Sequence, residues 1–114
     1  MDIKIYKWLY DVKVSIDEIN SYFAEEKLDF FEYEKNLMRK RAVERNLEII
    51  GEAVNRILKT DSTFMVKITD AAAIVSLRNK VIHAYDSISD ENIWAILINH
   101  LPTLKIEVNK LLKE

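Results

Sequence analysis

At 114 residues the chain is long enough to bury one hydrophobic core and too short for two, so we expect a single domain over residues 1–114. Hydrophobic residues make up 49% and charged residues 32%, which is typical of a folded protein and excludes a disordered one. The net charge of −2 argues against nucleic-acid binding through bulk positive charge, and the absence of cysteine excludes disulfides, thiolate metal sites and cysteine nucleophiles.

The chain contains one glycine and one proline, which predicts an all-α fold. Sheet proteins need turn residues every ~8–12 positions, and two such residues cannot supply them. The single glycine also excludes Walker A loops and dinucleotide-binding turns, which need several. No apolar run reaches the ~18 residues that cross a bilayer, and the N-terminus lacks a signal-peptide layout. We therefore expect a cytoplasmic protein with no membrane contact.

Two long amphipathic helices are predicted in the first half of the chain. Residues 2–24 place an apolar stripe on one face, and residues 33–59 place a second one around Gly51. Residues 25–29 form a polar break between them. A glycine inside a helix costs about 1 kcal/mol relative to alanine, so Gly51 predicts the close approach of a neighbouring helix. The second helix also carries a smaller apolar line, for which a self-association surface is one explanation: Met38, Ala42, Ile49 and Ala53.

The second half predicts a connector and two further helices. Residues 60–69 read as the connector, and Thr69 or Asp70 can cap a helix over residues 71–85. After a loop at 86–90, Ser89 or Asp90 can cap a last helix that runs to residue 112. Pro102 lies inside this pattern and predicts a kink or break. Four or five helices packed as a bundle follow from this pattern.

The helix at 71–85 has two different faces. Its predicted core stripe consists of Ala73, Ile74, Leu77, Val81 and Ala84. The other face mixes apolar residues with Arg78, Asn79, His83 and Tyr85, as in the wall of a cleft or an interface. Arg78 and His83 are about 140° apart on the helix and flank that face. Arginine can hold a phosphate through two parallel hydrogen bonds, and histidine can move protons near neutral pH. The pair could promote attack of an RNA 2′-hydroxyl on the adjacent phosphate.

Residues 78–85, which read Arg-Asn-Lys-Val-Ile-His-Ala-Tyr, resemble the Arg-x4-His-x-Tyr signature of the HepT group within the HEPN superfamily. Residues 48–53, Glu-Ile-Ile-Gly-Glu-Ala, resemble a helix of the same group. Residues 93–104, with their Leu-Pro, resemble its closing helix. The resemblance covers residues 41–112, about two-thirds of the chain.

The resemblance implies an all-α HEPN bundle of four to five helices that forms a homodimer with a shared cleft. It implies a metal-independent endoribonuclease that needs no cofactor and acts on cellular RNA. By this resemblance Arg78 would bind the scissile phosphate and His83 would act as general acid or base. Asn79 would orient the histidine or the phosphate.

The same group is similar to the toxins of type VII toxin–antitoxin systems. Their partner is an MntA-like nucleotidyltransferase antitoxin that transfers AMP to the motif tyrosine, here Tyr85. A bulky anion beside the arginine and histidine would block the cleft. The alternative is a non-catalytic HEPN partner that binds nucleotide or substrate for a minimal nucleotidyltransferase. A purely structural dimerisation module is a third interpretation.

Three other features have simpler interpretations. His100 is expected to be a satisfied core or interface histidine. The carboxylate line at Glu44, Glu48 and Glu52 is expected to be a solvated face with a Glu52–Arg56 ion pair, because no Glu-x-x-His pair accompanies it. The densest basic segment is expected to be solvated, with RNA contact as the other possibility: Lys35, Arg39, Lys40, Arg41 and Arg45.

Overall fold

The computed structural model describes residues 1–23, 29–83 and 89–114, with the backbone alone for residues 79–83. Across these ranges the chain is helical and contains no strand, which confirms the all-α prediction. The helices are α1 (Ile3–Ser21), α2 (Phe30–Lys35), α3 (Leu37–Thr60), α4 (Phe64–Lys67), α5 (Ala71–His83), α6 (Asp90–Asn99) and α7 (Leu101–Leu112).

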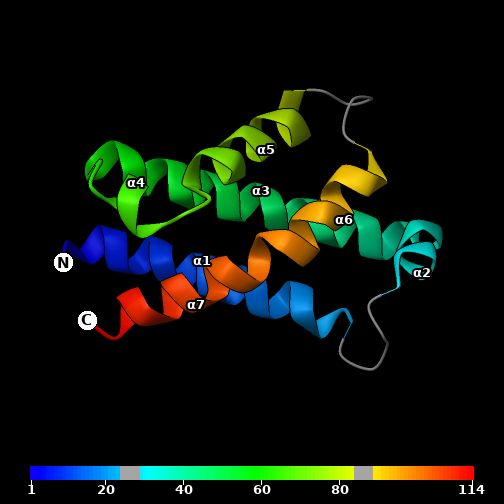
Figure 1. Ribbon diagram of the computed structural model, residues 1–114, viewed down its shortest axis with the longest axis horizontal. Helices are drawn as coiled ribbons and strands as arrows, with labels where there is room; N and C mark the ends of the chain where they lie inside the picture. The colour runs from blue at the N-terminus through cyan, green and yellow to red at the C-terminus, as the bar shows by residue number, and fades with distance from the viewer. Residues whose placement is uncertain (24–28, 84–88) are drawn as a thin grey trace.

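The long helix α3 is the centre of the bundle (Figure 1). It packs against α1 on one side and against α5 on the other, and α7 packs along α1. Helices α1 and α3 run in opposite directions, so the N-terminus lies at the end of the molecule away from α2. The C-terminus lies at that same end. The predicted helix on residues 71–85 is therefore a neighbour of α3.

Helix α1 follows its predicted apolar stripe. Asp2 caps the helix by accepting a hydrogen bond from the Lys4 backbone N–H at 2.7 Å. The side chains that repeat at three- and four-residue intervals are buried against α3 and α7: Ile5, Leu9, Val12, Ile16 and Ile19. Trp8 lies at the edge of this stripe and is half-buried.

The prediction of one continuous helix over residues 33–59 was wrong. The chain leaves the helical conformation at Asn36, with φ −102° and ψ 95°, and α3 starts afresh after it. The Asn36 side chain accepts a hydrogen bond from the Arg39 N–H at 3.0 Å, so it caps α3. A short amide side chain competes with helix hydrogen bonds in this way, and apolar periodicity does not reveal it.

The break predicted near Pro102 is confirmed. Helix α6 ends at Asn99, and Pro102 is the second residue of α7, where a backbone N–H is not required. Ser89 caps α6 by accepting a hydrogen bond from the Asn92 N–H at 3.1 Å, as expected.

The segment predicted as a plain connector, residues 60–69, contains the short helix α4. The loop predicted at 86–90 lies outside the described residues except for its last two.

The predicted core face of α5 needs one correction. Ile74 and Leu77 are buried as expected, but Ala73 is exposed and Ala71 is buried instead. Ala71, Ile74 and Leu77 follow a three-residue spacing, and Ala73 is turned about 100° away from Ile74. The side chain of Val81 and the whole of Ala84 are outside the described residues, so their place in the core face stays a prediction.

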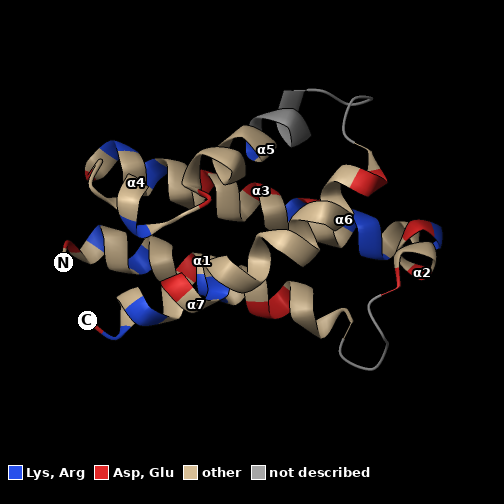
Figure 2. Cartoon of the chain, in the orientation of Figure 1, with Lys and Arg blue, Asp and Glu red and all other residues tan. Residues whose placement is uncertain are grey.

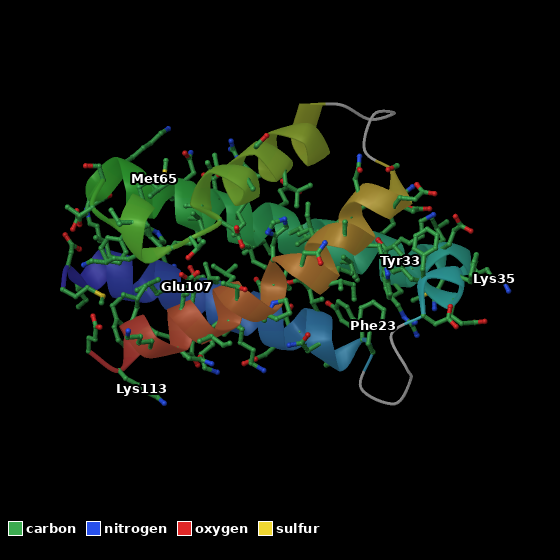
Figure 3. All side chains as sticks on the ribbon, viewed as in Figure 1. Phe23, Tyr33, Lys35, Met65, Glu107 and Lys113 are labelled. Carbon is green, nitrogen blue, oxygen red and sulfur yellow. The ribbon has the colours of Figure 1, made fainter. Side chains whose placement is uncertain are left out.

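An aromatic cluster joins α2 and α6 at the end of the molecule away from the termini. The ring of Tyr33 lies 6.2 Å from Phe23 and 5.4 Å from Trp94, centroid to centroid. Figure 3 shows Phe23 and Tyr33 beside each other at this end. Tyr33 is fully buried, and its hydroxyl has no hydrogen-bond partner among the described residues. Burial raises the pKa of Tyr33, and the nearby carboxylates of Asp90 and Glu44 raise it further.

None of the described helices is both long enough and apolar enough to span a membrane.

Candidate functional site

Helices α3 and α5 approach each other most closely where Gly51 faces Arg78. A Cβ atom built on Gly51 would lie 2.9 Å from Arg78 Cγ and 3.2 Å from the Ile74 carbonyl oxygen, and closer still to Arg78 Cβ. No other residue type fits there without moving α5. The prediction that Gly51 marks a close helix approach is confirmed, and the approaching helix is the one that carries the Arg-x4-His segment.

This approach places the Arg78 guanidinium on a carboxylate of α3. Arg78 Nη2 lies 2.5 Å from Glu52 Oε2, and Arg56 Nε donates to Glu52 Oε1 at 3.0 Å. Glu52 therefore bridges two arginines from two helices. The predicted Glu52–Arg56 ion pair is confirmed, but the contact with Arg78 could not be expected from helix spacing. The Arg78 side chain is 23% exposed, so its guanidinium is partly shielded from water.

Arg78 opens onto a hollow of about 310 Å³ between α1, α3 and α5. Its lining residues come from three distant parts of the sequence: Trp8 and Asp11 of α1, Arg45, Glu48, Ile49, Glu52, Ala53 and Arg56 of α3, and Arg78 of α5. Ile49 and Ala53, which belong to the smaller apolar line of α3, lie here. Met38 of the same line is 85% exposed near the start of α3.

The charges around the hollow are arranged in pairs. Arg45 lies 3.4 Å from Glu48, and Asp11 pairs with Lys7 outside the hollow at 2.9 Å. The charged side chains that line the hollow are three arginines and three carboxylates: Arg45, Arg56 and Arg78, with Asp11, Glu48 and Glu52. The lining is therefore balanced in charge.

The densest basic segment is neutralised by its neighbours. Lys40 pairs with Asp90 at 2.9 Å, Arg41 with Glu44 at 2.8 Å, and Lys35 approaches Glu32 at 3.9 Å. The guanidinium of Arg39 lies 5.0 Å above the Phe23 ring. Figure 2 shows positive and negative residues interspersed along the helices. Lys35 and Arg41 are exposed, as the solvated-face interpretation expects, whereas Lys40 is 18% exposed and links α3 to Asp90 of α6.

The carboxylate line on α3 is divided among arginines. Glu44 pairs with Arg41, Glu48 with Arg45, and Glu52 with both Arg56 and Arg78. Within the described part of the chain, no three histidine or acidic side chains are grouped closely enough to hold a metal ion.

The remaining residues of the motif are only partly within the description. Helix α5 extends through Asn79 to His83, so the backbone holds both on the same helix as Arg78. Their side chains, and the whole of Tyr85, lie outside the described residues. The roles assigned to Asn79, His83 and Tyr85 remain predictions.

His100 is partly exposed, and its Nδ1 has no hydrogen-bond partner among the described residues, so the prediction of a satisfied core or interface histidine was wrong. Its Nδ1 does lie 3.0 Å from Oδ2 of Asp70, at the start of α5, which is within ion-pair distance. Beside it, the Thr69 hydroxyl donates to Glu107 Oε2 of α7 at 2.6 Å. Figure 3 labels Glu107 on the α7 ribbon. The side chains of Thr69 and Asp70 therefore connect the start of α5 to the C-terminal helices.

Trp8, Asp11 and Arg56 were not recognised as site residues from the sequence. Trp8 looks like a core residue because it lies within the apolar stripe of α1. Its position at the edge of that stripe is the one signal that could have set it apart.

These features define the protein as an all-helical bundle in which Arg78 of α5 lies at the edge of a hollow between α1, α3 and α5. Residues 12–111 match the family model described as "Ribonuclease HepT-like". The chain belongs to this HepT-like family.

Similar proteins come from an archaeon and a bacterium. "Putative RNase MJ0127" of Methanocaldococcus jannaschii is 33% identical over 107 residues, which are 94% of this chain and 86% of the relative. MJ0125 of the same organism, with the same description, is 32% identical over 113 residues, or 99% and 93% of the two chains. TTE0752 of Caldanaerobacter subterraneus subsp. tengcongensis is 31% identical over 87 residues, or 76% and 77%. No solved structure matches the chain significantly.

Proposed function

We propose that this protein is a metal-independent endoribonuclease and the toxin of a type VII toxin–antitoxin system. The observation that carries the proposal is the placement of Arg78: a glycine-dependent helix contact holds it against Glu52 at the edge of a hollow. Membership of the HepT-like ribonuclease family, and relatives named for RNase activity, support RNA as the substrate.

In the proposed reaction, Arg78 donates hydrogen bonds to the scissile phosphate and stabilises the charge that builds on it. The imidazole of His83 removes the proton of the 2′-hydroxyl or protonates the 5′-oxygen. The 2′-oxygen forms a bond to phosphorus while the bond from phosphorus to the 5′-oxygen breaks. The products are a 2′,3′-cyclic phosphate and a free 5′-hydroxyl. Asn79 orients the histidine or the phosphate.

A homodimer is part of the proposal. Arg78 and His83 are five residues apart on α5 and so about 140° apart around its axis, which makes it difficult for both to reach one phosphate from a single helix. Two copies of α5 that face a shared cleft would supply an arginine and a histidine from opposite sides.

Regulation by an MntA-like nucleotidyltransferase antitoxin completes the proposal. AMP attached to Tyr85, two residues beyond His83, would introduce a phosphate beside Arg78. The guanidinium would then pair with that phosphate, and RNA would be excluded from the cleft.

The test is cleavage of a single-stranded RNA by the purified protein in EDTA. We expect cyclic-phosphate ends, and a loss of about 10²-fold or more in both Arg78→Ala and His83→Ala. Arg41→Ala is the matched control, because Arg41 is an α3 arginine paired with Glu44 outside the hollow. Full activity in both motif variants would refute the assignment.

A further inference from the structure

We propose that the hollow beside Arg78 binds one nucleotide of the substrate next to the cleaved phosphate. Its base would stack on Trp8, and its phosphate would pair with Arg45 and Arg56. The inference deepens the proposed function, because it rests on RNA being cleaved at Arg78. It assigns a role to α1, for which the sequence offers none.

Trp8 is placed as a stacking surface. Its neighbours in the apolar stripe, Ile5, Leu9 and Val12, are fully buried in the core, whereas Trp8 is half-buried and lines the hollow. Single-stranded RNA is recognised largely by stacking of its unpaired bases on aromatic side chains, and every base offers a face for it. A tryptophan beside a phosphate-binding arginine suits that contact.

The two arginines at the rim have the chemistry for a phosphate. The side chains of Arg45 and Arg56 are 67% and 57% exposed, and each is oriented by a carboxylate one turn away, Glu48 and Glu52. A guanidinium carries five N–H donors, so one carboxylate contact leaves it able to donate to a phosphate oxygen. Both residues line the same hollow as Trp8, which brings a stacking surface and two cations within one small space.

The size and lining of the hollow favour a single nucleotide. At about 310 Å³ it lies at the lower end of the volumes of small-molecule sites, too small for a folded RNA element. Ile49 and Ala53 offer a small apolar surface, and the other lining residues apart from Trp8 are charged. A lining of this kind suits a sugar and phosphate better than an apolar protein surface.

Binding can be measured without cleavage. The chain has two tryptophans, so Trp94→Phe leaves Trp8 as the only indole. We expect saturable quenching of Trp8 emission when this variant is titrated with a short single-stranded oligodeoxyribonucleotide, which lacks the attacking 2′-hydroxyl. Unchanged emission while anisotropy of a labelled oligonucleotide reports binding would overturn the proposal. Trp8 emission that changes with protein concentration but not with added oligonucleotide would also overturn the proposal, because a second copy of the chain would then cover the hollow.

Kinetics on RNA test the same contacts. Trp8→Leu should raise KM about 10-fold with little change in kcat, and Trp8→Phe should restore most of the loss. Tyr10→Leu is the control, because Tyr10 is exposed on α1 and does not line the hollow. Arg56→Gln should reduce the slope of log affinity against log salt by about 0.7, and Lys59→Gln should leave it unchanged. Equal slopes in the two variants would count against the phosphate contact.

The outcomes separate the two proposals. Quenching without any RNA cleavage would retain nucleotide binding in the hollow, but it would reject the ribonuclease and with it the place of that nucleotide beside a cleaved phosphate. Cleavage with a normal KM in Trp8→Leu would do the reverse. Neither binding nor cleavage would reject both.

Discussion

The contact between Gly51 and Arg78 gives the most direct test of how the fold positions the site. In Gly51→Ala the new methyl group would lie 2.9 Å from Arg78 Cγ and closer still to Arg78 Cβ, whereas carbon atoms prefer about 3.5–4.0 Å. Relief of both contacts requires α5 to move from α3 by more than about 1 Å. The 2.5 Å contact between Glu52 and Arg78 would lengthen with it.

Two effects on stability oppose each other in this variant. Replacing a helix-interior glycine by alanine gains about 1 kcal/mol of helix stability, whereas overpacking a helix interface costs about 1–3 kcal/mol. We expect a net loss of about 1 kcal/mol in the free energy of unfolding. A displacement of 1 Å at a group that binds the reacting phosphate can cost on the order of 10²-fold in rate. We therefore expect cleavage to fall much more than stability.

Urea unfolding followed by circular dichroism gives the stability, and RNA cleavage under saturating substrate gives kcat. Ser76→Ala is the matched control, because Ser76 is an exposed residue of α5 that gains helix propensity without a new contact. A Gly51→Ala protein that is more stable by about 1 kcal/mol and cleaves normally would refute the reasoning, because the helices would then tolerate the methyl group.

Three further outcomes are expected. Glu52→Gln should lower kcat, because Arg78 loses the carboxylate that orients it, and should lower KM, because a negative charge leaves the hollow. Glu44→Gln is the control outside the hollow and should change neither constant, and a rise in KM for Glu52→Gln would contradict the proposed role of Glu52. Tyr33→Phe should be at least as stable as wild type at pH 7, because the buried hydroxyl lacks a partner. Since the pKa of Tyr33 is raised in the folded state above the 10.0 of a free phenol, the unfolded chain loses this proton first. The free energy of unfolding of the wild type should therefore fall more steeply above pH 10.0 in urea titrations than that of the variant. After co-expression with a neighbouring nucleotidyltransferase, intact mass should show added AMP that Tyr85→Phe abolishes; the same adduct in that variant would place the modification elsewhere.

Much of the fold could be predicted because the signals for it are local. Helix periodicity located α1, α5 and most of α3, and Pro102 located the break between α6 and α7, since a proline ring cannot continue a helix from the preceding turn. The one glycine predicted a close helix contact because only glycine lacks the Cβ that prevents it. Asn36 was missed because a capping amide interrupts a helix without changing the apolar pattern.

The composition of the site depended on tertiary structure. The sequence determined that Arg78 and His83 share one helix, because they lie five positions apart on a continuous α5. It could not determine which helix Gly51 meets, that Glu52 bridges Arg56 and Arg78, or that Trp8 lies beside them. Gly51 and Glu52 are 27 and 26 positions from Arg78, and Trp8 is 70 positions from it, so their contacts and shared hollow depend on how α1, α3 and α5 pack. Spacing along one helix fixes which residues share a face, but only the packing of helices decides which faces meet.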